Sequence, residues 1–225
     1  AAKLKLTKLN SKYFMHKKIL TNHPGSSVLE LIKNKNSYCS YAWHDFSLNR
    51  NWGKGIINLF YESKFQNKKL AQQKIKTKFN LLKYNQPINF FNSFSIKIIN
   101  NFNLILNSIS KNKIIHINNL NFPMNTFPIY LWYFLNGKQG FIESQIIIPY
   151  KYFDKFNLQL KNLLFDEEVS VFGNVMKIFN GQKKNLSFDS NGVCVNYEFL
   201  NNKKNDNFFK NYYQIVSENH GITSL

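Results

Sequence analysis

Apolar residues recur at helical spacing along several stretches of the chain. In Ser95–Ile109 they fall three or four positions apart, which places on one stripe of a helix the side chains of Ile98, Phe102, Ile105 and Ile109. The pattern predicts an amphipathic helix whose stripe faces a core. Further helices are expected at Ser27–Ile32, opened by a serine cap, at Glu62–Lys83, where lysines alternate with apolar residues, and at Phe127–Leu135.

Other stretches are rich in β-branched and aromatic residues and are typical of strands. These are Ile114–Asn118, Phe141–Ile148, Val169–Phe179, Val193–Phe199 and Tyr212–Ser217. Between Tyr38 and Leu59 the chain is aromatic and polar and is interrupted by Gly53 and Gly55, so we expect irregular structure there. The order of helices and strands predicts an α+β fold.

The charge of the chain indicates its binding partner rather than its fold. The chain has 30 basic and 12 acidic residues, a formal net charge of +18. Residues 1–142 carry 21 basic and 3 acidic side chains, whereas residues 143–225 carry 9 of each. Such an excess repels itself and is stabilised by a polyanion, so RNA is the expected partner and its phosphates should meet the first part of the chain. The longest apolar run, Thr126–Asn136, is too short for a membrane span.

The amino-acid composition indicates the kind of genome that encodes the chain. Asn, Lys, Ile, Leu and Phe dominate, and Arg50 is the only arginine. AT-rich codons specify this set, which favours an organelle genome, either mitochondrial or plastid, with an AT-rich nuclear or bacterial genome as the alternative. Before Glu30 the only charged side chains are lysines, which is typical of a basic extension that contacts RNA, or of the remnant of a transit peptide.

Residues that carry catalysis or bind metals do not form a recognisable set. Cys39 and Cys194 belong to no paired-cysteine motif, and the five histidines form no closely spaced pair. The chain has no phosphate-binding glycine loop, and its one acidic cluster, Asp166 to Glu168, is typical of a solvated loop or a helix start. We therefore predict that the protein is not an enzyme and uses no cofactor.

Two segments in the second half of the chain, which we call the first and second anchors, resemble segments of a known family. A helix ending in Leu104–Ser110 leads through Lys111, Asn112 and Lys113 into a strand, and Pro123 and Gly140-Phe141-Ile142 follow in order. Near the end, Ser217 and Gly221 keep the spacing of a serine–glycine loop followed by Ile222. In this order the anchors resemble the universal small-subunit ribosomal protein number eight, the S-eight family. Glu218 departs from the pattern, because a threonine usually stands there.

The resemblance implies a structural protein of a mitochondrial, or alternatively plastid, ribosome that binds the central domain of the small-subunit ribosomal RNA. It implies two small α/β lobes of the S-eight type, residues 95–150 and 151–225, behind a basic, partly helical extension, residues 1–94. Ribosomal protein number five is the expected neighbour. The implied RNA contacts are Lys111, Asn112, Lys113, Ser217, Glu218, Asn219, His220, Gly221, Ile222 and Thr223.

Two other functions remain open. A soluble accessory subunit of a mitochondrial respiratory complex would carry the same lysines for reasons of codon composition alone. An RNA-processing enzyme would need an acid–base constellation that the sequence does not offer. The aromatic residues of Glu62–Lys83 are likewise open to two interpretations, as base-stacking side chains or as core residues beneath a solvated lysine face.

Overall fold

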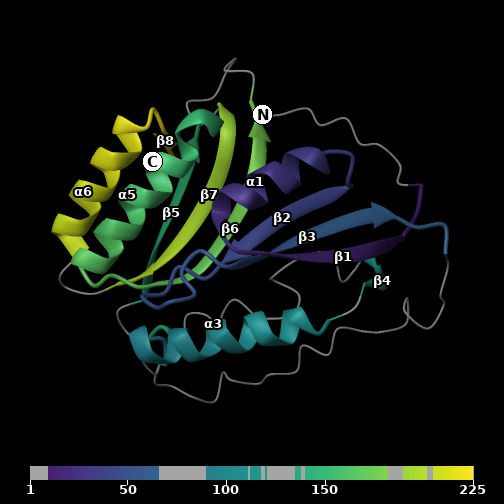
Figure 1. Cartoon of the computed structure of the whole chain (residues 1–225), viewed down its shortest axis with the longest axis horizontal. Helices are drawn as coiled ribbons and strands as arrows, with labels where there is room; N and C mark the ends of the chain where they lie inside the picture. The colour runs from purple at the N-terminus through teal and green to yellow at the C-terminus, as the bar shows by residue number, and fades with distance from the viewer. Residues whose placement is uncertain are drawn as a thin grey trace.

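A computed structural model shows an α+β protein built on one antiparallel sheet (Figure 1). It describes residues 10–65, 90–110, 112–117, 120, 135–137, 140–181, 190–201 and 205–224. The eight strands of the sheet are β1 (Tyr13–Thr21), β2 (Cys39–His44), β3 (Gly55–Glu62), β4 (Lys113–His116), β5 (Phe141–Ile148), β6 (Val171–Asn180), β7 (Asn191–Leu200) and β8 (Ile222–Thr223). The helices of the described residues are α1 (Pro24–Lys33), α3 (Ser93–Ser108), α5 (Phe153–Asp166) and α6 (Asn205–Glu218), with a 3-10 turn η3 (Tyr150–Tyr152) before α5.

The sheet consists of two halves with the same topology. Its strand order is β4-β1-β3-β2-β6-β7-β5-β8, so exchanging β1 to β4 with β5 to β8 reproduces the order read from the other edge. In each half the chain runs strand, helix, strand, strand, helix, strand, the split β-α-β arrangement. The described residues therefore form two similar units that share one sheet.

The two halves meet where β2 lies against β6. Only Ala42 and Met176 form a backbone pair there, whereas the neighbouring strand pairs are much longer. Two positions along, the side chain of Asn174 continues the pairing. Its Nδ2 donates to the backbone oxygen of His44 at 2.6 Å, and its Oδ1 accepts from the backbone nitrogen of His44 at 3.0 Å. A buried amide side chain thus takes the place of a ladder step.

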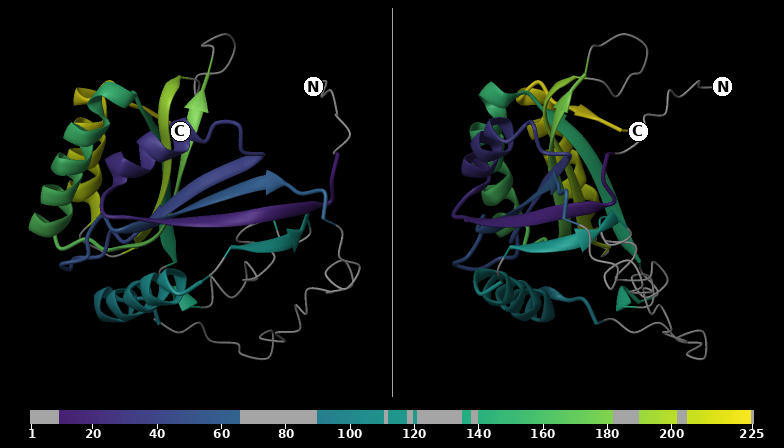
Figure 2. Two further views of the ribbon diagram at one scale, coloured as in Figure 1. Left: turned by 45° about the vertical axis from the view of Figure 1, so that its right-hand side comes forward. Right: turned by 90° about the vertical axis from the view of Figure 1, so that its right-hand side faces the viewer.

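One face of the sheet carries the main core. Helices α1, α5 and α6 lie on this face, whereas α3 lies on the opposite side of β1 to β3 (Figures 1 and 2). Alternate residues of the strands reach the core, among them Ile57 in the first half and Val195 in the second. The rings of Phe46 and Tyr197 lie 5.4 Å apart and join the two halves beneath the sheet. On the other face a smaller cluster gathers Phe14, Tyr41, Phe60 and Ile115.

The α+β prediction is confirmed, and so are most of the predicted elements. The helix over Ser95–Ile109 is α3, and the strands expected around residues 114, 141, 169 and 193 are β4, β5, β6 and β7. The helix expected at Ser27–Ile32 is α1, but it begins at Pro24. His23, rather than a serine, is its cap, because its Nδ1 accepts from the backbone nitrogen of Ser26 at 3.3 Å.

The prediction of a strand at Tyr212–Ser217 was wrong, because these residues belong to α6. Phe208, Tyr212 and Val216 recur at intervals of four, so a helix brings all three to one buried face. Helix α5 was not expected either, because the C-terminal lobe, residues 151–225, was predicted to be mostly β with an insertion. There Phe156, Leu160 and Leu164 repeat with the same interval.

The expectation of irregular structure between Tyr38 and Leu59 was also wrong, because β2 and part of β3 lie there. Strands from both sides of residue 94, where the extension was expected to end, belong to the same sheet. Residues 13–62 supply β1, α1, β2 and β3, which are hydrogen-bonded into the same sheet as the C-terminal strands. Most of the helices expected at Glu62–Lys83 and Phe127–Leu135 lie outside the described residues, although Glu62 itself ends β3.

None of the helices in the described part of the chain has the length and hydropathy needed to cross a bilayer.

We predict that Tyr212→Ala lowers the free energy of unfolding by about 3 kcal/mol, since it removes a fully buried ring. The hydroxyl of Tyr212 also lies 3.2 Å from Oγ of Ser144 in β5. Tyr213→Ala is the matched control, because the next ring along α6 is 42% exposed, and it should change stability by less than about 1 kcal/mol. Urea denaturation of both variants measures the difference, and equal losses would contradict the packing of α6.

Candidate nucleic-acid interface

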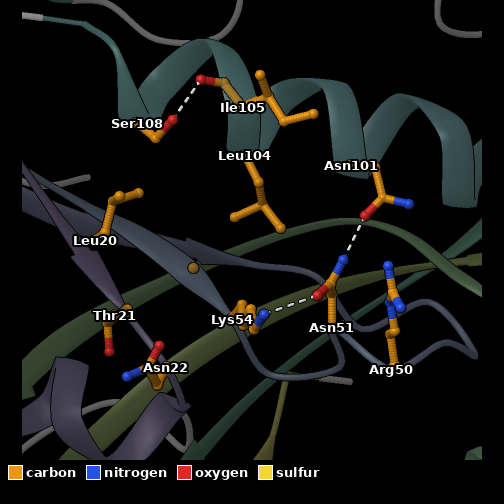
Figure 3. A pocket seen from close by; sticks show the side chains of 11 residues that line it. Leu20, Thr21, Asn22, Arg50, Asn51, Lys54, Asn101, Leu104, Ile105 and Ser108 are labelled. Atoms are coloured by element: carbon orange, nitrogen blue, oxygen red, sulfur yellow. Dashed lines mark hydrogen bonds between the residues drawn. The ribbon is translucent and has the colours of Figure 1, made fainter.

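A cleft opens between α3 and the strands beneath it. It has a volume of about 580 Å³ and lies where β1 ends and the β2–β3 loop turns (Figure 3). Leu20, Leu104 and Ile105 give it an apolar lining. Its polar lining consists of Thr21, Asn22, Arg50, Asn51, Lys54, Asn101 and Ser108, with Gly55 between them. We call this cavity the basic cleft.

The two cations of the basic cleft have no acidic partner among the described residues. Lys54 donates from Nζ to Oδ1 of Asn51 at 2.9 Å, and Asn51 in turn donates to Oδ1 of Asn101 on α3 (Figure 3). Arg50 makes no hydrogen bond or ion pair with the described part of the chain. A guanidinium and an ammonium held beside amide groups, with no carboxylate in the lining, favour an anionic ligand such as a phosphate.

Asp45, whose side chain is fully buried, holds in place the β2–β3 loop that carries both cations. Its Oδ1 accepts from the backbone nitrogen of Ser47 at 2.9 Å and from Nδ2 of Asn100 at 2.8 Å. Its Oδ2 accepts from Nδ2 of Asn49 at 3.1 Å. These bonds tie the β2–β3 loop to α3 and so hold the two walls of the cleft together.

Glycines shape the same loop. Gly53 has a φ of 83°, a left-handed conformation that a side chain disfavours. At Gly55 a Cβ atom would collide with the backbone oxygen of Trp43 and the ring of His44. The Nδ1 of His44 lies 2.8 Å from the backbone oxygen of Gly53, so the ring holds its Nδ1 proton toward that oxygen. Burial lowers the pKa of His44 to about 4, so the ring is neutral at pH 7.

Helix α3 attaches to the sheet by amides rather than by its apolar stripe. Asn100 reaches Asp45, Asn101 pairs with Asn51, and Asn107 accepts from Nζ of Lys18 at 2.6 Å. The expectation that the stripe faces a core was wrong. Its members are exposed, at 53% for Ile98, 60% for Phe102, 60% for Ile105 and 73% for Ile109. The buried side of α3 instead presents Ile96 and Asn100.

Cations continue from the basic cleft along β1 and β4. Lys18 lies two residues before Leu20 on the same face of β1, and burial, followed by the charge of Lys113, lowers its pKa. Lys113 begins β4, opposite His16, and Asn112 precedes it, both exposed. The predicted RNA contacts Asn112 and Lys113 therefore lie beside the cleft, whereas Lys111 lies outside the described residues.

The C-terminal group of predicted RNA contacts occupies the end of α6. Ser217 and Glu218 are its last residues, and His220 has a left-handed φ of 54° that ends the helix. Glu218 accepts from Nε2 of Gln159 in α5 at 3.3 Å, and the buried Asn219 donates to Oε1 of Gln159 at 2.6 Å. These contacts fasten α6 to α5.

Gly221, Ile222 and Thr223 complete this turn. A Cβ atom at Gly221 would collide with the side chain of Ile148, so packing requires glycine there. Ile222 and Thr223 form β8 and pair with β5. Because β4 and β8 are opposite edges of the sheet, seven strand spacings or about 34 Å separate the two predicted groups. They do not form one site.

Sequence reasoning missed the basic cleft. Arg50 and Lys54 belong to a stretch that was expected to be irregular, and Asn101 lies some 50 residues away along the chain. The available signals were the single arginine and the Gly53-Lys54-Gly55 triplet, which together mark a tight cationic loop. Neither signal indicates that α3 forms the other wall of the cleft.

Outside the basic cleft, the described residues offer few groups suited to metal binding or nucleophilic catalysis. No group of three or more His, Cys, Asp or Glu side chains among them is placed to hold a metal ion. Burial raises the pKa of both thiols, Cys39 and Cys194, so they are protonated at neutral pH and weak nucleophiles. In the acidic cluster, Glu167 accepts from Nδ2 of Asn207 at 3.0 Å and ties α5 to α6. Within these ranges the geometry favours anion binding.

The chain matches no family model and no curated protein. Among solved structures it is similar to berberine bridge enzyme from Eschscholzia californica, with 9% identity and a TM-score of 0.37. A variant of berberine bridge enzyme described as a reticuline dehydrogenase has 10% identity and a TM-score of 0.37. Each comparison covers 92% of this chain and 41% of the other, so this chain spans less than half the length of those proteins.

We predict that stability falls as the pH is lowered from 6.5 toward 4. The pKa of His44 is about 4 in the folded protein and near 6.5 in the unfolded chain, so protons bind the unfolded chain preferentially in this window. The loss from His44 should reach about 3 kcal/mol below pH 4, and His16, whose pKa burial also lowers to about 4, adds to it. Denaturant titrations at successive pH values measure the slope.

His44→Gln keeps a donor for the oxygen of Gly53 but cannot titrate, so its stability should depend less steeply on pH than that of the wild type. An unchanged slope in His44→Gln would show that this ring does not carry the effect.

Proposed function

We propose that this protein is an RNA-binding structural component of an organellar ribosome, in its small subunit, with mitochondria as the location and plastids as the alternative. The observation that carries the proposal is the basic cleft, where Arg50 and Lys54 have no acidic partner among the described residues. Both lie in the part of the chain that holds the entire charge excess. Phosphate groups of a folded RNA are the ligand that best complements this surface.

The geometry of the cleft suits a backbone contact. Arg50 can donate to two phosphate oxygens at once, and Lys54 is already oriented by its bond to Asn51. Asn22 and Ser108 add polar groups of the kind that contact sugars and phosphates. Lys18 and Lys113 extend the cationic surface along the sheet, so that a stretch of RNA backbone longer than one phosphate finds partners.

The S-eight assignment is the finer part of the proposal and has less support. Helix α3, strand β4 and strand β5, which begins at Phe141, keep the order of the first anchor. At the second anchor Ser217 lies in a helix rather than in a loop after a strand. The proposal of ribosomal RNA as the ligand therefore rests on the charge and the cleft more than on the family. The proposal of neighbouring ribosomal proteins such as number five as partners rests on the resemblance alone.

The exposed stripe of α3 supports membership in a larger assembly of some kind. Phe94, Phe102 and Ile109 are each at least 60% exposed, and such apolar surfaces are typical of contacts with a partner. A soluble accessory subunit of a respiratory complex would present the same stripe, and this is the one observation that favours the alternative function.

We expect the double variant Arg50→Ala/Lys54→Ala to weaken RNA binding and to reduce its dependence on salt. Each lost phosphate contact lowers the slope of log affinity against log salt by roughly 0.7 to 0.9, so two contacts should lower it by about 1.5. Fluorescence anisotropy with small-subunit ribosomal RNA fragments at several salt concentrations measures both quantities.

The matched control is Lys155→Ala/Lys210→Ala, which removes two exposed lysines from α5 and α6 on the other face of the sheet. It removes the same net charge but should leave a slope close to that of the wild type. Equal slopes for both double variants would mean that net charge, and not the cleft, binds RNA. Deletion of residues 1–90 is not a suitable test, because it removes three strands of the sheet.

A sucrose gradient of organelle lysate distinguishes the two functions. A ribosomal protein should sediment with the small subunit and should shift toward the top of the gradient after ribonuclease treatment. A respiratory subunit would sediment with a membrane complex that ribonuclease leaves intact, and this outcome would overturn the proposal.

A further inference from the structure

A second hollow lies on the same side of the sheet as α3, across the junction between the two halves. It has a volume of about 580 Å³, within the range of ligand sites, and it spans β2, β6, β7 and β5. Residues that line it include Tyr38, Val175, Lys177, Gln145 and Asn196. We call this cavity the sheet hollow.

The strand register sets a row of side chains across the sheet hollow. Val175 of β6 is paired with Asn196 of β7, and Asn196 is paired with Gln145 of β5, so all three stand side by side on one face. Lys177 stands two residues along β6 from Val175. Val175, two amides and the ammonium group of Lys177 thus stand on neighbouring strands. The carboxylate of Glu143 lines the other end of the row, two residues before Gln145, and the rest of the lining is Cys39, Tyr41, Leu120 and Cys194.

One of the two amides has a buried atom without a partner among the described residues, and the other is exposed. The Oδ1 atom of Asn196 is buried and has no hydrogen-bond partner there. Nε2 of Gln145 donates only to the sulfur of Cys194, at 3.7 Å, and a thiol is a weak acceptor. A buried polar atom without a partner costs about 1 to 3 kcal/mol, so a ligand donor that meets Oδ1 of Asn196 after a rotation of its amide would recover this loss. The exposed amide of Gln145 can donate to an acceptor of the ligand.

An aromatic ring stands at the edge of the sheet hollow. Tyr38 precedes β2, is 46% exposed, and is held in place by its backbone bond to Phe60 at 2.8 Å and by the ring of Phe14, 4.7 Å away. A ring that is fixed in position and still exposed can stack on a flat ligand. The ligand indicated by these groups is flat, has hydrogen-bond donors and acceptors on its edge, and is linked to an anion within reach of Lys177.

We propose that the sheet hollow binds one unpaired nucleobase of an RNA strand. The base would stack on Tyr38 and would exchange hydrogen bonds with Asn196 and Gln145, while Lys177 neutralises its phosphate. Unpaired bases are recognised in this way, by stacking together with hydrogen bonds to their edges. The inference rests on the proposed function and adds to it a preference for single-stranded RNA that the basic cleft does not provide.

The test compares a short labelled single-stranded RNA with a blunt-ended duplex of the same length, by anisotropy with the full chain. Tyr38→Ala and Gln145→Ala should each weaken single-strand binding, by roughly tenfold for Tyr38→Ala, and should leave duplex binding and the salt slope unchanged. Tyr38→Phe keeps the ring and should retain wild-type affinity. Tyr213→Ala is the matched control, since it removes a similarly exposed tyrosine from α6.

The outcomes separate the inference from the proposed function. If the wild type binds RNA and the sheet-hollow variants bind both RNAs as tightly, the inference is overturned while the proposed function stands. If the wild type binds neither RNA, both are overturned. Photo-crosslinking of a thiouridine-containing single strand to the peptide around Tyr38 is the second readout, and crosslinks confined to other peptides would also overturn the inference. If a free nucleotide competes at micromolar concentration, the base is recognised without its strand, and the preference for RNA is overturned.

Discussion

The arrangement of the molecule depends on one buried amide at the junction of its two halves. Strands β2 and β6 share a single backbone pair, and the side chain of Asn174 supplies the next two hydrogen bonds by donating to and accepting from the backbone of His44. Both cavities lie beside this junction. The β2–β3 loop with Arg50 and Lys54 begins directly after His44, and the sheet hollow spans the strands on either side. A change in the angle between the halves would therefore alter the sheet hollow, whereas the basic cleft is lined by residues of the first half alone.

Polar contacts also decide how α3 is placed. A helix with an apolar stripe normally buries it, because burial of each large side chain contributes about 1.5 to 3 kcal/mol. Here three asparagines of α3 bond to β1 and to the β2–β3 loop, and one of them, Asn100, donates to the buried carboxylate of Asp45. A buried carboxylate that lost its donors would be costly, so this network fixes the orientation of the helix and leaves its stripe exposed. The polar network around Asp45 thus explains both the exposure of the stripe and the cleft between α3 and the sheet.

The sequence predicted the fold class and the elements whose periodicity was unambiguous. The strand at Phe141–Ile148 and the helix around Ile98 were identified because their patterns extend over two or more turns or repeats. Tyr212 was assigned to a strand because a short run of β-favouring residues outweighed an interval of four that is visible only with Phe208 and Val216. The basic cleft could not be predicted, because Arg50 and Asn101 meet only through the packing of α3, which depends on Asp45. Asn174 gives no local signal at all.

The two cavities would contribute to RNA binding in different ways. The basic cleft offers charge with little shape selectivity, so its contribution should weaken as salt is added. The sheet hollow offers stacking and hydrogen bonds that depend little on salt and require a base free of its partner. With a formal net charge of +18, the isolated chain also repels itself, and a bound polyanion would relieve that repulsion. RNA binding would then stabilise the folded chain.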